Sequence, residues 1–473
     1  MNQRKLVILL FVITFSLAGC SMFHPRPISP ARTATAFEAR TLDNAGLKEF
    51  LKKNVGHKIT PWPSKSWDFQ MLTLVAFYYH PDLDVARAQW GVAEARVGTA
   101  SGRPNPSVGF TPQYDADAAR GVSPWKLSPT FDIPIETAGK RGYRIEQARH
   151  LSDAARLNIA TVAWQVRSRL RVRLIDSYAT SQVEAFLIRQ QGVQEEIVKL
   201  LEQRLGFGEI SQPDVTQARI SLAQTQLSLR DAQKQRAEAR VQLADALGLP
   251  VGALDGVDLS FGFLDRAAIN LPSQDVQRQA LLNRPDILAA LVEYAASQSA
   301  LQLDIAKQYP DIHLGPGYSW DQAENKWSLG ISLTLPVFNQ NQGPIAEAEA
   351  RRKEAAARFT ALQARVVGET DRALAGYRAA LQTLETADRL LESRREQQRS
   401  VQTMFDIGQA DRLALRSAQL ELIAAELSRF NSLTTVQQSL GLLENAVQRP
   451  LNPPESIANV PERNPRPSEE NNE

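Results

Sequence analysis

Residues 312–335 read IHLGPGYSWDQAENKWSLGISLTL, and large apolar side chains alternate in this stretch with small or polar ones. A period of two is that of a β-strand, in which successive side chains point to opposite faces. The alternation pauses around Asp321 to Lys326, so the stretch predicts two strands joined by a turn. Each strand would have roughly nine to eleven residues, the length that crosses a bilayer with its apolar face toward lipid. A half-buried hairpin on an ordinary folded domain is the alternative.

A looser strand pair is predicted earlier in the chain, at about residues 105–135. Its apolar positions are Val108, Phe110, Tyr114, Leu127, Phe131, Ile133 and Ile135. Pro112 and Pro129 fall inside its two runs, and proline weakens a prediction of regular strands because it cannot donate a ladder hydrogen bond. Tryptophans lie near the turns of both pairs, where a membrane–water interface would favour them. They are Trp125, Trp320 and Trp327.

Four strands cannot close a barrel, and an open sheet edge is not tolerated in lipid. Membrane-spanning strands would therefore require several copies of the chain. A dimer would supply eight strands, and side chains would largely fill the lumen of such a barrel. A trimer would supply twelve strands and leave room for a pore.

The chain repeats itself. His80-Pro81-Asp82-Leu83 has its counterpart in Arg284-Pro285-Asp286-Ile287 at an offset of 204, and Gly208 has its counterpart in Gly408 at an offset of 200. Each copy is far longer than a solenoid unit of about 20–50 residues. We expect a first structural repeat over residues 67–265 and a second over residues 266–450, with strand pairs at about 105–135 and 310–338.

Each strand pair precedes a long stretch rich in helix formers. Proline is absent between Ile345 and Arg449, and the first copy is interrupted only at Pro213 within its helical part. A helix from about Lys140 to Leu205 would be roughly 100 Å long at 1.5 Å per residue. Each stretch breaks once, which predicts antiparallel helical hairpins at about residues 139–248 and 343–448.

The hairpin breaks are predicted to be tips, each with a glycine that can take a positive φ and an N-cap residue, Ser211 or Asp411. An ordinary turn of a helical bundle is one interpretation. The other interpretation is a contact or gate surface, because apolar side chains, Ile407 among them, would otherwise be exposed at both tips. The candidate tip residues are Phe207, Gly208, Ile210, Asp214, Phe405, Asp406, Gly408 and Asp411.

The amino terminus has the pattern of a lipoprotein signal. Arg4 and Lys5 precede a short apolar run that ends in Leu17-Ala18-Gly19-Cys20. We expect residues 1–19 to be a signal peptide and Cys20 to be acylated, which would anchor the chain in lipid. An ordinary secretory signal with a chance cysteine is the alternative. Residues 20–66 are predicted to be a tether containing a short helix, and residues 451–473 a disordered tail.

Composition excludes several classes of protein. Without Arg4 and Lys5, the 54 basic residues fall to 52, equal to the 52 acidic ones, which argues against a nucleic-acid partner. The sequence has no P-loop and no HExxH, so neither an enzyme nor a metal site or cofactor is expected. His313 would line the lumen as a polar residue, with metal handling the less favoured role. The five histidines are scattered: His24, His57, His80, His150 and His313.

Taken in their order along the chain, these features resemble the outer-membrane factor (TolC-like) family of outer membrane efflux proteins, of the lipoprotein type. The resemblance covers about Trp67 to Pro450. Residues 335–343, LPVFNQNQG, are especially similar to the branch that serves heavy-metal resistance pumps. The first copy keeps Ile133-Pro134-Ile135 but lacks the Asn and Gln run.

The resemblance implies an α+β membrane protein with an internal two-fold repeat. A homotrimer would form a twelve-stranded transmembrane β-barrel and a periplasmic α-barrel of helical hairpins in the Gram-negative outer membrane. It would be the passive exit duct of a tripartite efflux pump or a type I secretion-like system. Its partners would be outer-membrane lipid, a periplasmic adaptor protein and an inner-membrane pump of the RND type.

Family members often carry an acidic gate on the second hairpin, but those positions here are Ala414 and Ser417. The nearest acids, Asp214, Asp406 and Asp411, are therefore the candidate lumen or gate residues. Two other classes stay open: a lipid-anchored periplasmic adaptor, and a structural coiled-coil protein of an envelope complex.

Overall fold

The computed structural model describes residues 22–55, 60–265, 273–321 and 324–451. The chain divides into two compact units after Thr41. The first holds helix α2 (Pro30–Glu38), which begins at the Ser29 N-cap and buries none of its residues. Cys20, His57, the predicted signal peptide and the tail after Leu451 lie outside the described residues.

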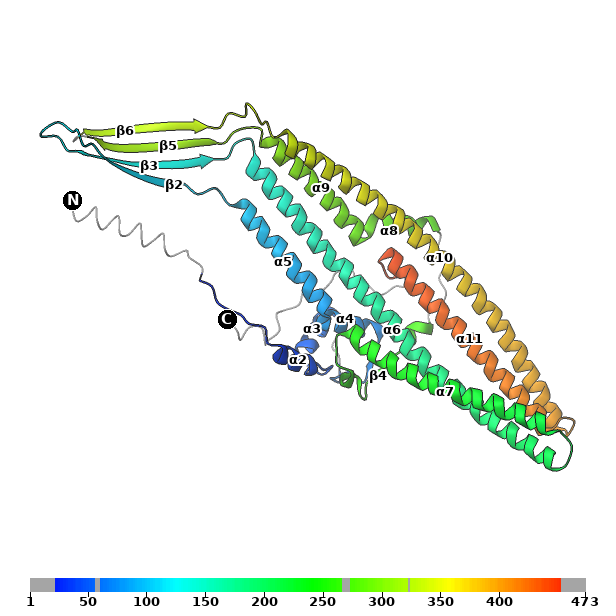
Figure 1. Cartoon of the computed structure of the whole chain (residues 1–473). Helices are drawn as coiled ribbons and strands as arrows, with labels where there is room; N and C mark the ends of the chain where they lie inside the picture. Colours follow the sequence, from blue (N-terminus) through cyan, green and yellow to red (C-terminus); the bar gives the residue numbers. More distant parts are fainter. Residues whose placement is uncertain (1–21, 56–59, 266–272, 322–323, 452–473) are drawn as a thin grey trace. The chain divides into compact units, whose positions relative to one another are not determined.

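The second unit contains the same five elements twice, in the same order (Figure 1). The first series is α5 (Pro81–Ser101), β2 (Ser107–Tyr114), β3 (Trp125–Ile135), α6 (Lys140–Gly206) and α7 (Gln212–Leu247). The second series is α9 (Pro285–Ala306), β5 (Ile312–Asp321), β6 (Glu324–Leu333), α10 (Gln342–Asp406) and α11 (Arg412–Val447). Shorter elements complete the unit: α3 (Ala45–Val55), β1 (Ser66–Trp67), α4 (Phe69–Tyr79), η1 (Val251–Leu254), β4 (Asp258–Leu259), η2 (Gly262–Asp265) and α8 (Ser273–Asn283).

The long helices have the predicted extent. Helix α6 has 67 residues and α10 has 65, so each is roughly 100 Å long at 1.5 Å per residue. The helix expected from Lys140 to Leu205 ends one residue later, at Gly206. Ser211 is the N-cap of α7 and Asp411 the N-cap of α11, as predicted from the sequence.

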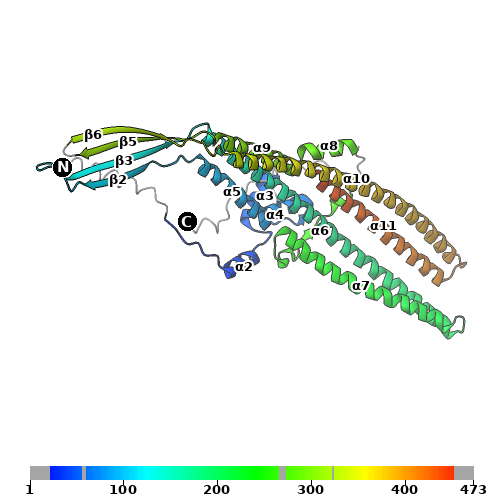
Figure 2. The ribbon, with the colours of Figure 1, turned by 45° about the horizontal axis from the view of Figure 1, so that its top comes forward.

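Strands of both series form one antiparallel sheet in the order β2-β3-β5-β6, at the end of the unit opposite the hairpin tips (Figures 1 and 2). Leu314 pairs with Ile331 on one side and with Ile133 on the other. Val108 pairs with Phe131 in the same alternation. Because the register sets most apolar residues opposite apolar ones, the sheet has one apolar and one polar face, which confirms the predicted alternation.

Both prolines lie within strands, although they weakened the sequence prediction. Pro112 belongs to β2, and Pro129 to β3. β2 is an edge strand, where a missing N–H donor leaves no neighbour unsatisfied. The apolar alternation therefore outweighs the local effect of proline at that edge.

The main core lies where α4 packs against α6 and α7 and where α3 packs on α4. Leu47, Phe50 and Leu51 of α3 are buried, and the Phe50 ring lies 5.4 Å from that of Tyr78. Residues 42–55 are thus part of the folded core, and the prediction that they belong to a tether is wrong. The tether interpretation failed because the apolar partner of this short helix, α4, lies beyond Trp67 in the sequence. A second core joins Val276 of α8 to α10 and α11.

Gly248 lies at the end of α7, beside the main core. It has φ +71 and is the helix C-cap, and an added Cβ would lie 2.8 Å from the Tyr79 carbonyl oxygen and 3.0 Å from the His80 Cα. Gly248→Ala is expected to lower the free energy of unfolding by about 2–3 kcal/mol, because left-handed strain adds to a backbone clash. Thermal melting of the purified protein measures this.

The matched control is Gly256→Ala, since Gly256 has φ +72 but open space around the added Cβ. It should cost only about 1 kcal/mol, from backbone strain alone. Equal losses in the two variants would contradict the close approach of α7 to the α4–α5 junction.

Candidate membrane sheet and hairpin-tip surfaces

The apolar face of the sheet is exposed. Trp327 is 81% exposed and Ile331 66%, and Phe338, just beyond β6, is 100% exposed. The two edge strands, β2 and β6, are exposed at every residue. One chain therefore presents a continuous apolar surface and two unpaired sheet edges, both of which need cover.

The three tryptophans lie near the strand turns. Trp125 pairs with Tyr114, and their rings are 5.2 Å apart. Trp327 pairs with Tyr318, with ring centroids 4.9 Å apart, and Trp320 follows two residues later along β5. The distal end of the sheet thus carries a band of aromatic side chains.

The opposite face of the sheet is polar and charged at both ends. His313 Nδ1 lies 3.0 Å from an Asp132 carboxylate oxygen near the helices. Toward the turns, Asp321 accepts from Lys326 Nζ at 2.9 Å and lies 3.2 Å from Lys126 Nζ. Among the described residues, no group of three or more His, Cys, Asp or Glu side chains is arranged to hold a metal ion.

At the far end, apolar side chains are exposed on both hairpin tips. Phe207 is 81% exposed, Ile407 is exposed, and Phe405 is on the border of exposure, while Ile210 is half-buried. Gly208 and Gly408 both have φ +76 and reverse the chain in the same way. The tips therefore resemble each other in backbone but differ in side chains.

The tip carboxylates have local partners. Asp214 accepts from the Ser211 backbone N–H at 3.0 Å and from its hydroxyl, and these hydrogen bonds hold the pKa of Asp214 below its usual value. Asp411 accepts from the Ala414 N–H at 2.7 Å, and this bond, with help from Arg204, lowers the pKa of Asp411. Asp406 accepts from Gln402 at 2.8 Å. Asp214, through its capping box with Ser211, and Asp411, as an N-cap, thus stabilise the starts of α7 and α11 in their ionised forms.

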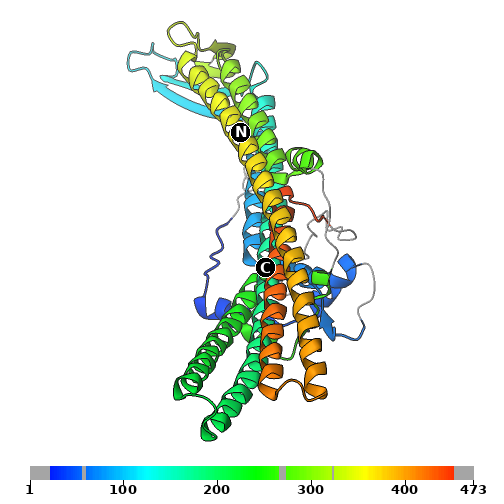
Figure 3. The same ribbon diagram turned by 90° about the vertical axis from the view of Figure 1, so that its right-hand side faces the viewer.

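Ion pairs join the two hairpins of one chain along the junction of α6 and α11 (Figure 3). They include Arg204–Asp411 at 2.5 Å, Glu196–Arg416 at 2.5 Å, and Arg189–Glu426. No local pattern in the sequence predicts these ion pairs, because the two partners of each pair lie more than 200 residues apart.

A buried ion cluster joins α6 to α11 near the C-terminal end of α11, away from the hairpin tips. Glu444 is 2% exposed and accepts from Arg167 Nη1 at 3.1 Å and Arg171 Nη1 at 3.3 Å. Arg284, the N-cap of α9, donates to the Ala446 carbonyl of α11 at 2.7 Å. The two Glu444 ion pairs therefore link the first series to the second, and the Arg284 hydrogen bond joins α9 to α11 within the second series.

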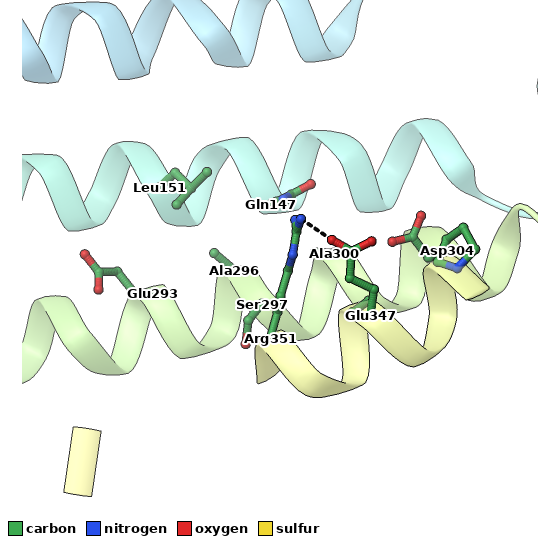
Figure 4. A pocket seen from close by; sticks show the side chains of 11 residues that line it. Gln147, Leu151, Glu293, Ala296, Ser297, Ala300, Asp304, Glu347 and Arg351 are labelled. Atoms are coloured by element: carbon green, nitrogen blue, oxygen red, sulfur yellow. Dashed lines mark hydrogen bonds and ion pairs between the residues drawn. The ribbon is translucent and has the colours of Figure 1, made fainter. Parts of the chain in front are cut away.

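A pocket of about 250 Å³ lies between α6, α9 and α10 (Figure 4). Leu151 and Ala296 give it apolar walls, and Glu293 and the Glu347–Arg351 pair line its rim. Typical small-molecule pockets are larger, about 300–1,000 Å³. The pocket is therefore a shallow gap between helices rather than a ligand site.

No helix among the described residues is both long enough and apolar enough to cross a bilayer.

Known proteins share this sequence pattern and fold. A family model described as "Outer membrane efflux protein" matches residues 76–249 and 276–447. The cobalt-zinc-cadmium resistance protein CzcC of Cupriavidus metallidurans is 25% identical over 368 residues, 74% of this chain and 83% of that protein. The pyoverdine export outer membrane protein OpmQ of Pseudomonas aeruginosa is 26% identical over 301 residues, 58% of this chain and 61% of that protein. A crystal structure of CusC has a TM-score of 0.65 at 17% identity, and the match covers 90% of this chain and 99% of that one.

Proposed function

This chain belongs to the outer membrane efflux protein family, and from that premise we propose that three copies form the exit duct of a tripartite efflux pump. The protein is an outer-membrane efflux channel, and the predicted likeness to the heavy-metal branch is confirmed by the match to CzcC. As a member of a channel family, it conducts its cargo rather than converting it.

One observation carries the proposed assembly: a four-stranded sheet with an exposed apolar face and two unpaired edges. Unpaired backbone groups cannot remain in hydrocarbon, so the sheet has to close with others. Three sheets give twelve strands, with β6 of one copy paired to β2 of the next. Such a barrel is wider than an eight-stranded one, whose side chains fill the lumen. Its polar face, with Lys126, Asp132 and His313, lines the passage.

The long helices extend the duct away from the membrane. Each copy contributes α6, α7, α10 and α11 at the tip end, so a trimer builds a periplasmic tunnel of twelve helices. Because the tips lie opposite the sheet, they reach toward the inner membrane (Figure 1). We assign the exposed tip residues Phe207, Ile210, Phe405 and Ile407 to contact with a periplasmic adaptor, which couples the duct to an RND-type pump.

The remaining site residues take roles in anchoring and conduction. Acylation of Cys20 anchors each copy in outer-membrane lipid, and Trp125, Trp320 and Trp327 lie at a membrane–water interface. Asp214, Asp406 and Asp411 place carboxylates at the tips, near Gly208 and Gly408, where the tunnel narrows.

Metal cations are the cargo that we favour, since CzcC is matched over 83% of its length and OpmQ over only 61%. A deletion strain distinguishes the two cargo classes. We expect it to lose resistance to cobalt, zinc or cadmium salts while siderophore export and resistance to hydrophobic drugs stay normal. The opposite pattern would reject metal cargo but leave the duct itself intact.

Fractionation followed by sizing in detergent tests the duct. The expected result is an outer-membrane species of three times the mass of one chain. A monomer released from the inner membrane would contradict the proposal and favour a lipid-anchored adaptor.

A further inference from the structure

We propose that His313 and Asp132 form a contact for divalent transition-metal cations on the lumen wall of the duct, at the end of the barrel that joins the helices. The pair is a contact for passing cargo such as Zn²⁺ rather than a resident metal centre. The inference deepens the proposed function, since it rests on the trimeric duct and on metal cargo. Three observations support it: the geometry of the pair, the charge balance of the polar face, and the open space around the imidazole.

The two side chains lie within hydrogen-bond distance on the polar face of the sheet. His313 Nδ1 is 3.0 Å from one carboxylate oxygen of Asp132 and 3.1 Å from the other. Because an ionised carboxylate can only accept, Nδ1–H is the donor and Nε2 carries the free lone pair. Nε2 has no hydrogen-bond partner among the described residues. An imidazole that donates to a carboxylate from one nitrogen and leaves the other open has the arrangement of most metal-binding histidines.

Asp132 also differs from the other carboxylates of the polar face in its charge balance. Asp321 lies 3.2 Å from Lys126 Nζ and 2.9 Å from Lys326 Nζ, and Glu324 lies 3.5 Å from Lys326 Nζ. Within the part of the chain that the structure describes, no lysine or arginine pairs with Asp132. With a neutral imidazole, the pair therefore carries an uncompensated negative charge, which favours cations in a passage.

The space beside the imidazole is open. The side chains of His313 and Asp132 are 39% and 47% exposed. Gly315 and Gly330 pair with each other one step further along the polar face, and Gly317 follows on β5. These three positions project no side chain over the ring. Because the polar face lines the lumen of the proposed barrel, Nε2 stays within reach of a cation in the passage.

A single imidazole suits a passage better than a closed site does. Structural zinc sites have four protein ligands and catalytic ones three. No group of three or more His, Cys, Asp or Glu side chains among the described residues could hold a metal ion. Conduction requires a site that binds strongly enough for entry and weakly enough for exit. Imidazole suits Zn²⁺ and other transition-metal cations, whereas Mg²⁺ prefers oxygen ligands. The pair would therefore distinguish these two kinds of divalent cation.

The repeat gives the duct three such pairs rather than six. Strands β2 and β5 correspond at an offset of 204, so the counterpart of His313 is Gly109. Strands β3 and β6 correspond at an offset of 202, set by the apolar-Pro-apolar run at their ends, so the counterpart of Asp132 is Thr334. The junction that β6 makes with β2 of the next copy therefore lacks both groups. The metal contact belongs to the β3–β5 junction inside each chain.

Current through single trimers in a planar bilayer tests the pair. With KCl as the conducting salt, Zn²⁺ should reduce the wild-type current reversibly, because a bound cation in the passage repels K⁺. The same concentration of Mg²⁺ should leave the current unchanged. We expect His313→Gln to raise the Zn²⁺ concentration for half block by at least about tenfold. His150→Gln is the control, because it removes a histidine from helix α6, outside the sheet, and it should respond to Zn²⁺ as the wild type does.

Two further variants separate the ligand from its positioning residue. Asp132→Asn keeps the imidazole but removes the charge, and it should raise the half-blocking Zn²⁺ concentration about tenfold, as loss of an outer-shell carboxylate does. Ser332→Asp adds a carboxylate opposite His313 in the register. Cross-strand side chains about 4.5–5.5 Å apart can bind one cation together, so this variant should lower the half-blocking concentration.

Unchanged block in His313→Gln, or an equal loss of block in His150→Gln, would overturn the proposal. Equal block by Mg²⁺ and Zn²⁺ would overturn it too, because carboxylates alone would then account for the effect. A wild-type trimer that conducts K⁺ without any response to Zn²⁺ would have the same consequence. A wild-type chain that forms no conducting trimer would instead reject the proposed function, so the two failures are distinguishable.

Discussion

Glu444→Ala is expected to lower the free energy of unfolding by about 3–5 kcal/mol, the usual cost of breaking a buried ion pair by removing one partner. Glu444 is 2% exposed, and its carboxylate pairs with the guanidinium groups of Arg167 and Arg171, residues that are 3% and 4% exposed. Its second oxygen accepts from the Leu451 backbone N–H at 3.2 Å. Removal of the carboxylate takes away the buried anion that the two guanidinium groups share at the junction of α6 and α11.

Denaturant unfolding followed by helical circular dichroism measures this loss. Glu426→Ala is the matched control, because it removes the same group from an ion pair between the same two helices, but with Arg189 52% exposed. That change should cost at most about 1 kcal/mol. A loss for Glu444→Ala no larger than for Glu426→Ala would show that the buried cluster tolerates unbalanced charge.

Ile331→Asp should nearly abolish assembly of the outer-membrane trimer, whereas Ser332→Asp should leave it close to normal. Ile331 is 66% exposed on the apolar face and pairs with Leu314, while its neighbour Ser332 pairs with His313 on the polar face. A charge on the lipid face of a barrel costs up to a few kcal/mol near mid-membrane, and a trimer would bear that cost three times. On the lumen face the same charge stays hydrated.

The amount of trimer in outer-membrane fractions, assayed on gels before and after heating, compares the two variants. The pair is well matched, since the same aspartate is introduced at adjacent residues of one strand. Equal losses in both variants would contradict the assignment of the apolar face to lipid.

Local signals in the sequence explain which parts of the fold could be predicted. The alternation in β5 and β6 and the absence of proline along α6 are properties of neighbouring residues, so they were readable directly. The caps Ser211 and Asp411 were readable for the same reason, because a capping side chain bonds a backbone group only about three residues away. Helix α2 buries no residue, and it was not predicted.

Interactions between distant residues could not be predicted. The burial of Leu47 and Leu51 depends on the helix α4 that covers them, and Arg204–Asp411 joins residues that only the fold brings together. The roles of the acidic residues at the tips could also be predicted only in part. Their type and position suggested a gate, but the structure reveals that Asp214 and Asp411 are also needed as helix caps.

The equal lengths of α7 and α11, 36 residues each, have a consequence for stoichiometry. Both tips turn at a glycine with φ +76, so the proposed trimer would present six turns of one backbone shape. An adaptor that recognises the turn alone finds six equivalent sites. One that distinguishes Phe207-Gly208-Glu209 from Ile407-Gly408-Gln409 finds only three of each kind. The number of adaptor subunits bound per channel therefore reports whether the partner recognises backbone shape or side chains.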